Sequence, residues 1–213
     1  MRPMTSRLLA LAVLLALSAP LRAETTLDDL LNAAEMGHNR TVMEGVRRGM
    51  DVNSSDEAGV SLLMRAAREG NLELTDFLLR NGANVRARTS WGDTAMSLAG
   101  QKGHTAVIRR LIEGGSEVNQ PGWSALLYAA MEGHLDTVKL LLEKGANPDS
   151  RAPSQLTPLM IASRNGHIKV VRALLAAKAD PNAKNDRGDT ALKWALDSQN
   201  TDIGELLRAA GAR

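Results

Sequence analysis

Histidines are the first residues of this 213-residue sequence to suggest chemistry, because imidazole is the commonest protein ligand of transition metals. All of them follow a glycine and hold the same place in a segment that repeats about every 33 residues. Packed helices lie about 8–10 Å apart and metal–ligand bonds are about 2 Å long, so equivalent side chains of successive segments cannot share one ion. We therefore expect no metal site, no cofactor, and a structural role in an interhelical turn. The four histidines are His38, His104, His134 and His167.

Methionine offers a second route to metal binding, since thioether sulfur is a soft ligand that suits copper. Met64, Met96 and Met160 nevertheless stand where a short helix needs an apolar side chain, and we interpret them as core residues. The sequence has no Gly-x-Ser-x-Gly elbow, no His-Glu-x-x-His pair and no Walker loop, so we expect no catalytic residues. A copper chaperone and an enzyme are the weaker alternatives for this chain.

The composition predicts a folded, helical protein. Apolar residues make up 44% of the chain, but only five are aromatic, which favours packed helices over a β-sandwich. The absence of cysteine excludes disulfides, cysteine-ligated zinc and thiol catalysis. A formal charge of +2 is too small for a nucleic-acid-binding protein, so we expect no nucleic acid partner.

Residues 1–23 have the features of a secretory signal peptide. A basic start (1–7) precedes an apolar stretch (8–17), and the small-residue ending at Ala23 comes just before Glu24. We predict cleavage after Ala23 and export to a bacterial periplasm. An uncleaved membrane anchor is the weaker alternative, because the apolar stretch is shorter than the roughly 20 residues that span a bilayer. The leader holds three of the 26 basic residues and no acid, so the mature chain has 23 basic against 24 acidic residues and, we expect, does not insert into a membrane.

Three landmarks divide the remaining chain into units. A glycine followed by a polar residue stands at 37, 70, 103, 133 and 166, with spacings of 33, 33, 30 and 33 residues. Nine residues before most of these glycines, a hydroxyl residue such as Ser124 is placed to cap a short helix, which the glycine then ends. A second amphipathic helix follows, with an apolar face such as Val138, Leu141 and Leu142. Each unit is therefore predicted to be a helix-turn-helix.

The best-formed unit contains Thr157-Pro158-Leu159-Met160-Ile161-Ala162. This segment and the 33-residue period resemble the ankyrin repeat family, whose signature is T-P-L-H-x-A. The resemblance covers Leu27 to Gly211, although no copy keeps the histidine of the motif. It implies an all-α ankyrin-repeat solenoid of stacked helix-turn-helix units with β-hairpin fingers, which binds another protein through its concave face.

We predict one ankyrin repeat domain, 24–213, after the signal peptide. It consists of an N-terminal capping unit (24–53), four repeats (57–86, 90–119, 120–149 and 153–182) and a C-terminal capping repeat (186–213). The segment from Gly115 to Ser124 is three residues shorter than its counterparts, so one finger is clipped and the binding face changes there.

Position in the repeat places nine candidate partner-binding residues on the concave face. Two tryptophans lie in successive fingers near arginines, and both residue types are enriched at interface hot spots. The alternative is that each tryptophan covers the backbone of a neighbouring finger. We predict an exported, monomeric, non-catalytic protein-interaction module that supports or protects an envelope enzyme; the alternative is an inhibitor or immunity protein that occludes a toxin. The nine residues are Trp91, Trp123, Arg88, Asp93, Lys102, Met131, Arg151, Leu156 and Arg164.

Overall fold

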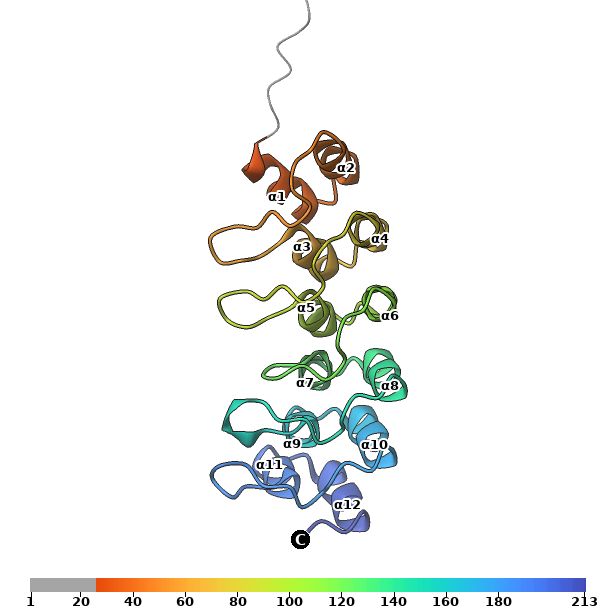
Figure 1. Cartoon of the computed structure of the whole chain (residues 1–213). Coiled ribbons are helices and arrows are strands. Elements are labelled where there is room, and N and C mark those ends of the chain that lie inside the picture. Colours follow the sequence, from red (N-terminus) through yellow and green to blue (C-terminus); the bar gives the residue numbers. More distant parts are fainter. Residues whose placement is uncertain (1–25) are drawn as a thin grey trace, which may run out of the picture.

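Figure 1 shows a computed structural model of the chain, in which residues 26–213 are described and form six stacked helix pairs. The predicted signal peptide, residues 1–23, lies outside the described residues. The all-helical solenoid of six units is confirmed. The first helices of the pairs are α1 (Leu27–Glu35), α3 (Leu62–Arg68), α5 (Ala95–Lys102), α7 (Ala125–Glu132), α9 (Pro158–Arg164) and α11 (Ala191–Asp197). The second helices are α2 (Asn39–Arg47), α4 (Leu72–Arg80), α6 (Thr105–Glu113), α8 (Leu135–Glu143), α10 (Ile168–Ala176) and α12 (Thr201–Ala209).

The two helices of each pair lie in separate columns of the stack. Figure 1 shows the first helices, here named inner helices, in one column and the second, outer helices in the other. Loops project from the inner column on the side away from the outer helices. These loops are the first finger (54–60), second finger (87–93), third finger (120–123), fourth finger (151–156, including the 3-10 turn Pro153–Gln155) and fifth finger (184–189). The inner helices and fingers together form the surface on which the sequence places its candidate residues.

Each inner helix begins at a hydroxyl residue and ends at a turn. In α9, the Oγ1 of Thr157 accepts a hydrogen bond from the N–H of Met160 at 3.3 Å, and Pro158 occupies the first helical position. Gly166 follows with a φ of 79°, a left-handed conformation that ends the helix at little cost. The predicted helix starts are confirmed, because the same side-chain cap is made by Thr26, Ser61, Thr94, Ser124 and Thr190.

Apolar side chains between the two columns form a continuous core. Met64, Met96 and Met160 are at most 1% exposed, which confirms them as core residues. Arg208 is exposed at the last unit, as a polar end of the stack requires. One leucine of every outer helix from α4 onward is fully buried at the same place in the unit: Leu78, Leu111, Leu141, Leu174 and Leu207.

A histidine after three of the turn glycines joins its unit to the unit before it. Nε2 of His104 lies 3.0 Å from the carbonyl oxygen of Arg68, and Nε2 of His134 lies 3.0 Å from that of Gln101. Nε2 of His167 makes the same contact, at 2.9 Å, with the carbonyl oxygen of Met131. A carbonyl oxygen only accepts, so Nε2 carries the proton. The expected structural role is confirmed for these three histidines.

Inner helices α5 and α7 approach more closely at Gly100 than a side chain would allow. A Cβ atom at Gly100 would lie 2.7 Å from the carbonyl oxygen of Ala125 and 2.8 Å from its Cα. The equivalent residues of α3, α7 and α9 are Ala67, Ala130 and Ser163, which all carry a Cβ. The close backbone contact therefore distinguishes the boundary between α5 and α7, the same boundary that carries the short third finger.

The fingers follow a hairpin course without forming strands. In residues 26–213 the one β-bridge is isolated and joins Ser55 to Ser61. A single backbone hydrogen bond closes the second finger, from the N–H of Thr89 to the carbonyl of Asp93 at 2.9 Å. Equivalent bonds close the first, fourth and fifth fingers. Because so few residues lie inside each closing bond, the expected β-hairpins are present as turns rather than as paired strands.

Candidate binding surface

The tips of the fingers are hydrogen-bonded in two pairs. The N–H of Ser90 donates to the carbonyl of Ala58 at 2.9 Å, which joins the second finger to the first. The N–H of Asp186 donates to the carbonyl of Ser154 at 3.3 Å, which joins the fifth finger to the fourth. The third finger makes no such tip bond among the described residues, and Figure 1 shows it as the short loop before α7. The row of fingers is therefore interrupted at its middle.

Trp91 lies at the tip of the second finger and is 75% exposed. Its backbone N–H donates to Oγ1 of Thr89 at 3.3 Å, so the main chain beneath the side chain is fixed by the finger. The indole ring stacks on no other aromatic ring of the described chain. A large apolar side chain in this position does not stabilise the array, which leaves it available for a partner.

Trp123 is only partly exposed, because it packs on a small apolar cluster of its own. Its ring lies 5.2 Å from that of Tyr128, with 33° between the ring planes. Leu127 and Ile161 are buried beneath it, and Met131 and Leu156 pack around the same cluster. The structure thus brings together the predicted residues Trp123, Met131 and Leu156, and places Trp91 separately on an exposed tip.

Asp93 is connected to this cluster through Tyr128. The hydroxyl of Tyr128 donates to Oδ1 of Asp93 at 3.0 Å, across the boundary between α5 and α7. Burial of the phenol is the largest cause that raises the pKa of Tyr128 to about 12; the negative charge of Asp93 and the hydrogen bond to it act in the same direction. The phenol therefore stays neutral at physiological pH and acts as a hydrogen-bond donor to the carboxylate.

The three predicted arginines each make a contact within the chain. Nη1 of Arg88 donates to the carbonyl of Gly92 at 2.9 Å, within its own finger. Nη1 of Arg151 donates to the carbonyl of Lys184 at 3.0 Å and so joins the fourth finger to the fifth. The guanidinium carbon of Arg164 lies 5.4 Å from the centre of the Trp194 ring, in cation–π geometry. These contacts orient the side chains without neutralising them.

Lys102 occupies the last turn of α5, where its side chain is exposed. It makes no hydrogen bond or ion pair with any described residue. Its ammonium group is therefore free to contact a partner without breaking a contact that stabilises the fold.

Tyr128 is the surface residue that the sequence analysis missed. It holds the place in α7 that Arg65, Leu98, Ile161 and Trp194 hold in their inner helices, and side chains at this place face the fingers in several units. A signal was present, since Tyr128 is the single tyrosine of the chain and follows Trp123 by five residues.

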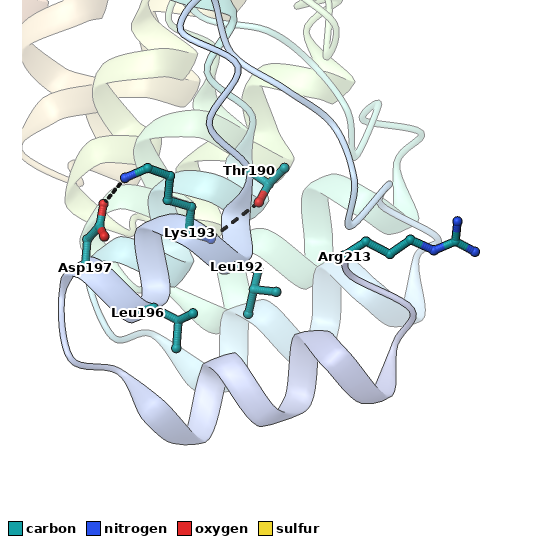
Figure 2. Close-up of a pocket in the computed structure, with 6 residues that line it drawn as sticks. All are labelled: Thr190, Leu192, Lys193, Leu196, Asp197 and Arg213. Carbon is teal, nitrogen blue, oxygen red and sulfur yellow. Dashed lines mark hydrogen bonds and ion pairs between the residues drawn. The ribbon is translucent and has the colours of Figure 1, made fainter.

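A shallow pocket lies at the C-terminal end of the stack, on the last inner helix (Figure 2). Its volume of about 260 Å³ is below the roughly 300–1,000 Å³ of most ligand sites. Two of its three charged side chains pair with each other, since Nζ of Lys193 lies 2.5 Å from Oδ2 of Asp197, and Arg213 is the third. Leu192 and Leu196 supply its apolar wall. We therefore assign no ligand to this pocket.

Neither metal-ligand clusters nor membrane spans occur in the part of the chain that the structure describes. Residues 26–213 contain no group of three or more histidine, aspartate or glutamate side chains placed to hold a metal ion. The helices over the same range are nine residues long at most, and none is long and apolar enough to cross a bilayer.

A family model described as ankyrin repeats (3 copies) matches residues 63–152 and 126–213, which together cover more than half of the chain. These matches begin within α3 and end at the last residue of α12's unit. They therefore include every finger except the first, and every candidate residue of the binding surface.

Several curated proteins share this similarity. The chain is 34% identical over 133 residues to the ankyrin repeat and KH domain-containing protein mask-1 of Caenorhabditis elegans, which covers 60% of this chain and 5% of that protein. It is 34% identical over 169 residues to the Bos taurus ankyrin repeat and SOCS box protein 3, covering 61% and 32%. With the probable 26S proteasome regulatory subunit p28 of Saccharomyces cerevisiae it shares 36% identity over 104 residues, covering 46% of each. The chain thus spans less than half the length of each of these relatives.

Proposed function

The chain belongs to the ankyrin repeat family, whose repeats are protein-interaction modules, and we propose that it binds a partner protein through its fingers and inner helices. The observation that carries this proposal is Trp91, whose indole is 75% exposed on a finger fixed by backbone hydrogen bonds. Trp on a rigid support is a frequent hot spot, because it buries a large area at a small entropic cost.

Trp91→Ala tests this assignment. A cross-linked pull-down from the envelope fraction recovers the partner, and calorimetry then measures its affinity for each variant. We expect Trp91→Ala to weaken binding by about 2 kcal/mol or more, with unchanged helicity. Leu72→Ala is the matched control, because Leu72 is a large apolar side chain, 44% exposed, but lies on outer helix α4 rather than on a finger or an inner helix. Equal affinities for wild type and Trp91→Ala would refute the assignment.

We further propose that the module has no chemistry of its own. The side chains best suited to chemistry, His104, His134 and His167, each hold a carbonyl oxygen of the preceding unit at 2.9–3.0 Å. These contacts supply a structural reason for the histidines that requires neither a metal nor a substrate. Copper retained stoichiometrically after dialysis against metal-free buffer would contradict this part of the proposal.

Export to the periplasm is the proposed location, and it rests on residues 1–23 of the sequence. The expected mature chain begins at Glu24. Fractionation of cells that express the full chain, followed by amino-terminal sequencing, tests both points. A protein that stays in the cytoplasm with Met1 in place would overturn the export proposal but leave the binding surface unaffected.

The partner that we propose is an envelope enzyme which the module supports or protects. The activity of the recovered partner, measured with and without this chain under heat or oxidative stress, separates the two roles left open by the sequence. Preserved activity supports protection. Activity blocked in proportion to the amount of added chain would instead identify an inhibitor or immunity protein.

A further inference from the structure

The interrupted row of fingers leaves apolar surface uncovered at the middle of the binding surface. The first and second fingers are bonded tip to tip, as are the fourth and fifth, but the third finger between them is three residues shorter. Apolar side chains from the third finger to the fourth remain partly exposed beside this step. We name Trp123, Tyr128, Met131 and Leu156 the central patch; Trp91 lies separately, at the tip of the second finger.

Several basic side chains towards the two ends of the same surface form ion pairs within the chain. Towards the N-terminal end, Arg65 and Arg68 both pair with Glu35; the Arg68 pair has an N–O distance of 2.7 Å. Towards the C-terminal end, Nζ of Lys193 lies 2.5 Å from the carboxylate of Asp197. Not every cation there is paired, since Lys184 of the fifth finger and Arg213 form no ion pair with a described residue.

Basic side chains around the central patch differ, because none of them forms an ion pair with a described carboxylate. Two acidic residues lie among them: Asp93, which accepts a hydrogen bond from Tyr128, and Glu132, which is exposed at the end of α7. Residues 24–213 hold one more acidic than basic residue, so the four unpaired basic side chains around the central patch form a local excess of positive charge. The four basic residues are Arg88, Lys102, Arg151 and Arg164.

Two of these arginines are already oriented for a carboxylate. Arg88 and Arg151 each use Nη1 to hold backbone carbonyls of the fingers, at distances of 2.9–3.2 Å. A guanidinium group has five N–H donors, so most of its donors remain free. A planar guanidinium that is fixed before binding favours bidentate contact with a carboxylate and loses less side-chain entropy than a mobile lysine.

We propose that the central patch binds an acidic segment of the partner protein, in which carboxylates flank one large apolar side chain. The apolar side chain contacts Trp123 and its neighbours, and the carboxylates contact Arg88 and Arg151 on the fingers to either side. The inference rests on the proposed function and specifies the chemistry of the partner. A nucleic acid fits less well, since affinity for nucleic acid comes mainly from contacts of many Lys and Arg side chains with phosphates, and this patch offers four cations beside two carboxylates.

A phage-displayed library of random 12-residue peptides, selected on the immobilised full chain, tests the proposal. We expect enriched peptides with aspartate or glutamate on both sides of a Trp, Phe, Leu or Met. Synthetic copies should bind at least tenfold more weakly to Lys102→Glu, a change that removes no contact within the fold, and binding should weaken as salt is added. Arg151→Glu should have a larger effect, and a thermal melt shows whether its fingers remain intact.

Lys139→Glu is the matched control. Lys139 is exposed on outer helix α8 and makes no ion pair with a described residue, so the same change of charge occurs away from the fingers. This variant should bind the selected peptides within twofold of wild type. Peptides without an acidic bias, equal loss for Lys139→Glu and Lys102→Glu, no enrichment above a bare surface, or tighter binding of a single-stranded oligonucleotide would each overturn the proposal.

The peptide selection and the test of the proposed function can fail independently of each other. If the recovered partner depends on Trp91 but the selected peptides are neutral or basic, the binding module stands and the acidic segment does not. If the partner is indifferent to Trp91 while acidic peptides depend on Lys102, the assignment of the hot spot fails and the charge recognition stands.

Discussion

Gly100→Ala tests the close contact of α5 and α7, because helix propensity and packing predict opposite effects on stability. In the interior of a helix, replacing glycine by alanine stabilises by about 0.5–1 kcal/mol. The added Cβ, however, would lie 2.7 Å from the carbonyl oxygen of Ala125, whereas carbon–oxygen contacts in proteins are normally about 3.3 Å or longer. The two inner helices must therefore separate by about 0.6 Å.

This separation involves backbone atoms, so no side-chain rotation relieves it. Overpacking of this kind costs about 1–3 kcal/mol, and we expect the upper end because two of the three contact atoms at Ala125 belong to the main chain and the third is its Cβ, which cannot rotate away. After the gain of about 1 kcal/mol in propensity, the net loss is about 2 kcal/mol. For a domain of this size, such a loss lowers the melting temperature by about 4–8 °C.

Thermal and urea melts followed by circular dichroism provide the assay, with Gly204→Ala in α12 as the matched control. A Cβ at Gly204 would meet Cδ2 of Leu196 at 3.1 Å, and Leu196 is 41% exposed, so its side chain can turn away. The control should be neutral or up to about 1 kcal/mol more stable. A Gly100→Ala variant as stable as the control would show that α5 and α7 have room for a side chain and would refute this reasoning.

Three further perturbations probe the core and the binding surface. Thr75→Val should raise the free energy of unfolding by about 1 kcal/mol in urea melts, because the buried Oγ1 of Thr75 has no hydrogen-bond partner among the described residues. Leu141→Ala should lower it by about 2–5 kcal/mol, since the fully buried side chain leaves a cavity. The single tyrosine, Tyr128, should titrate by ultraviolet absorbance near pH 12, and Asp93→Asn should lower that midpoint while burial keeps it above the usual value of about 10. In the wild type, the unfolded state loses the phenol proton at about pH 10, whereas the folded state keeps it up to about pH 12. The free energy of unfolding of the wild type should therefore fall as pH rises from about 10 to 12.

The two core variants each have a control within the chain. Thr137→Val should cost about 1 kcal/mol rather than add stability, because Oγ1 of Thr137 lies 2.8 Å from the hydroxyl of Thr105. Leu72→Ala should change stability by less than about 0.5 kcal/mol, since Leu72 is 44% exposed. An unchanged melt for Leu141→Ala would show that the inner face of α8 is wrongly assigned, and a Tyr128 midpoint near pH 10 would show that the phenol is solvated.

The repeat could be predicted from sequence because its signals are local. A capping hydroxyl such as Thr157 and a turn glycine such as Gly166 act within a few residues of their own position, so their spacing revealed each helix and each unit. The periodic leucines likewise indicated the buried face of each outer helix. These features depend on neighbours in the chain rather than on distant contacts.

The details of the binding surface depend on contacts between residues about one repeat length apart in the sequence, and these were harder to predict. Arg151 bonds to the carbonyl of residue 184, and Tyr128 bonds to Asp93. Both partners could have been sought one repeat away along the sequence. No feature of the sequence predicted that Trp91 is exposed and that Trp123 is partly buried. This difference depends on which finger tips contact each other, and the contacts depend on the lengths of the fingers. Hairpin strands were expected from the family resemblance, but the fingers are too short to pair.

The contacts that the histidines make between units also determine how the number of repeats can change. His104, His134 and His167 bind the carbonyl at the end of the preceding inner helix, whichever residue supplies it: Arg68, Gln101 or Met131. Because the histidine contacts only the main chain, any internal unit with Gly-His between its two helices can follow any other. Duplication or loss of one whole unit would recreate the same bond at the new junction. The side-chain contacts of the central patch, in contrast, depend on the particular residues of neighbouring units. Loss of one of these units would therefore preserve the fold but remove the surface around the third finger.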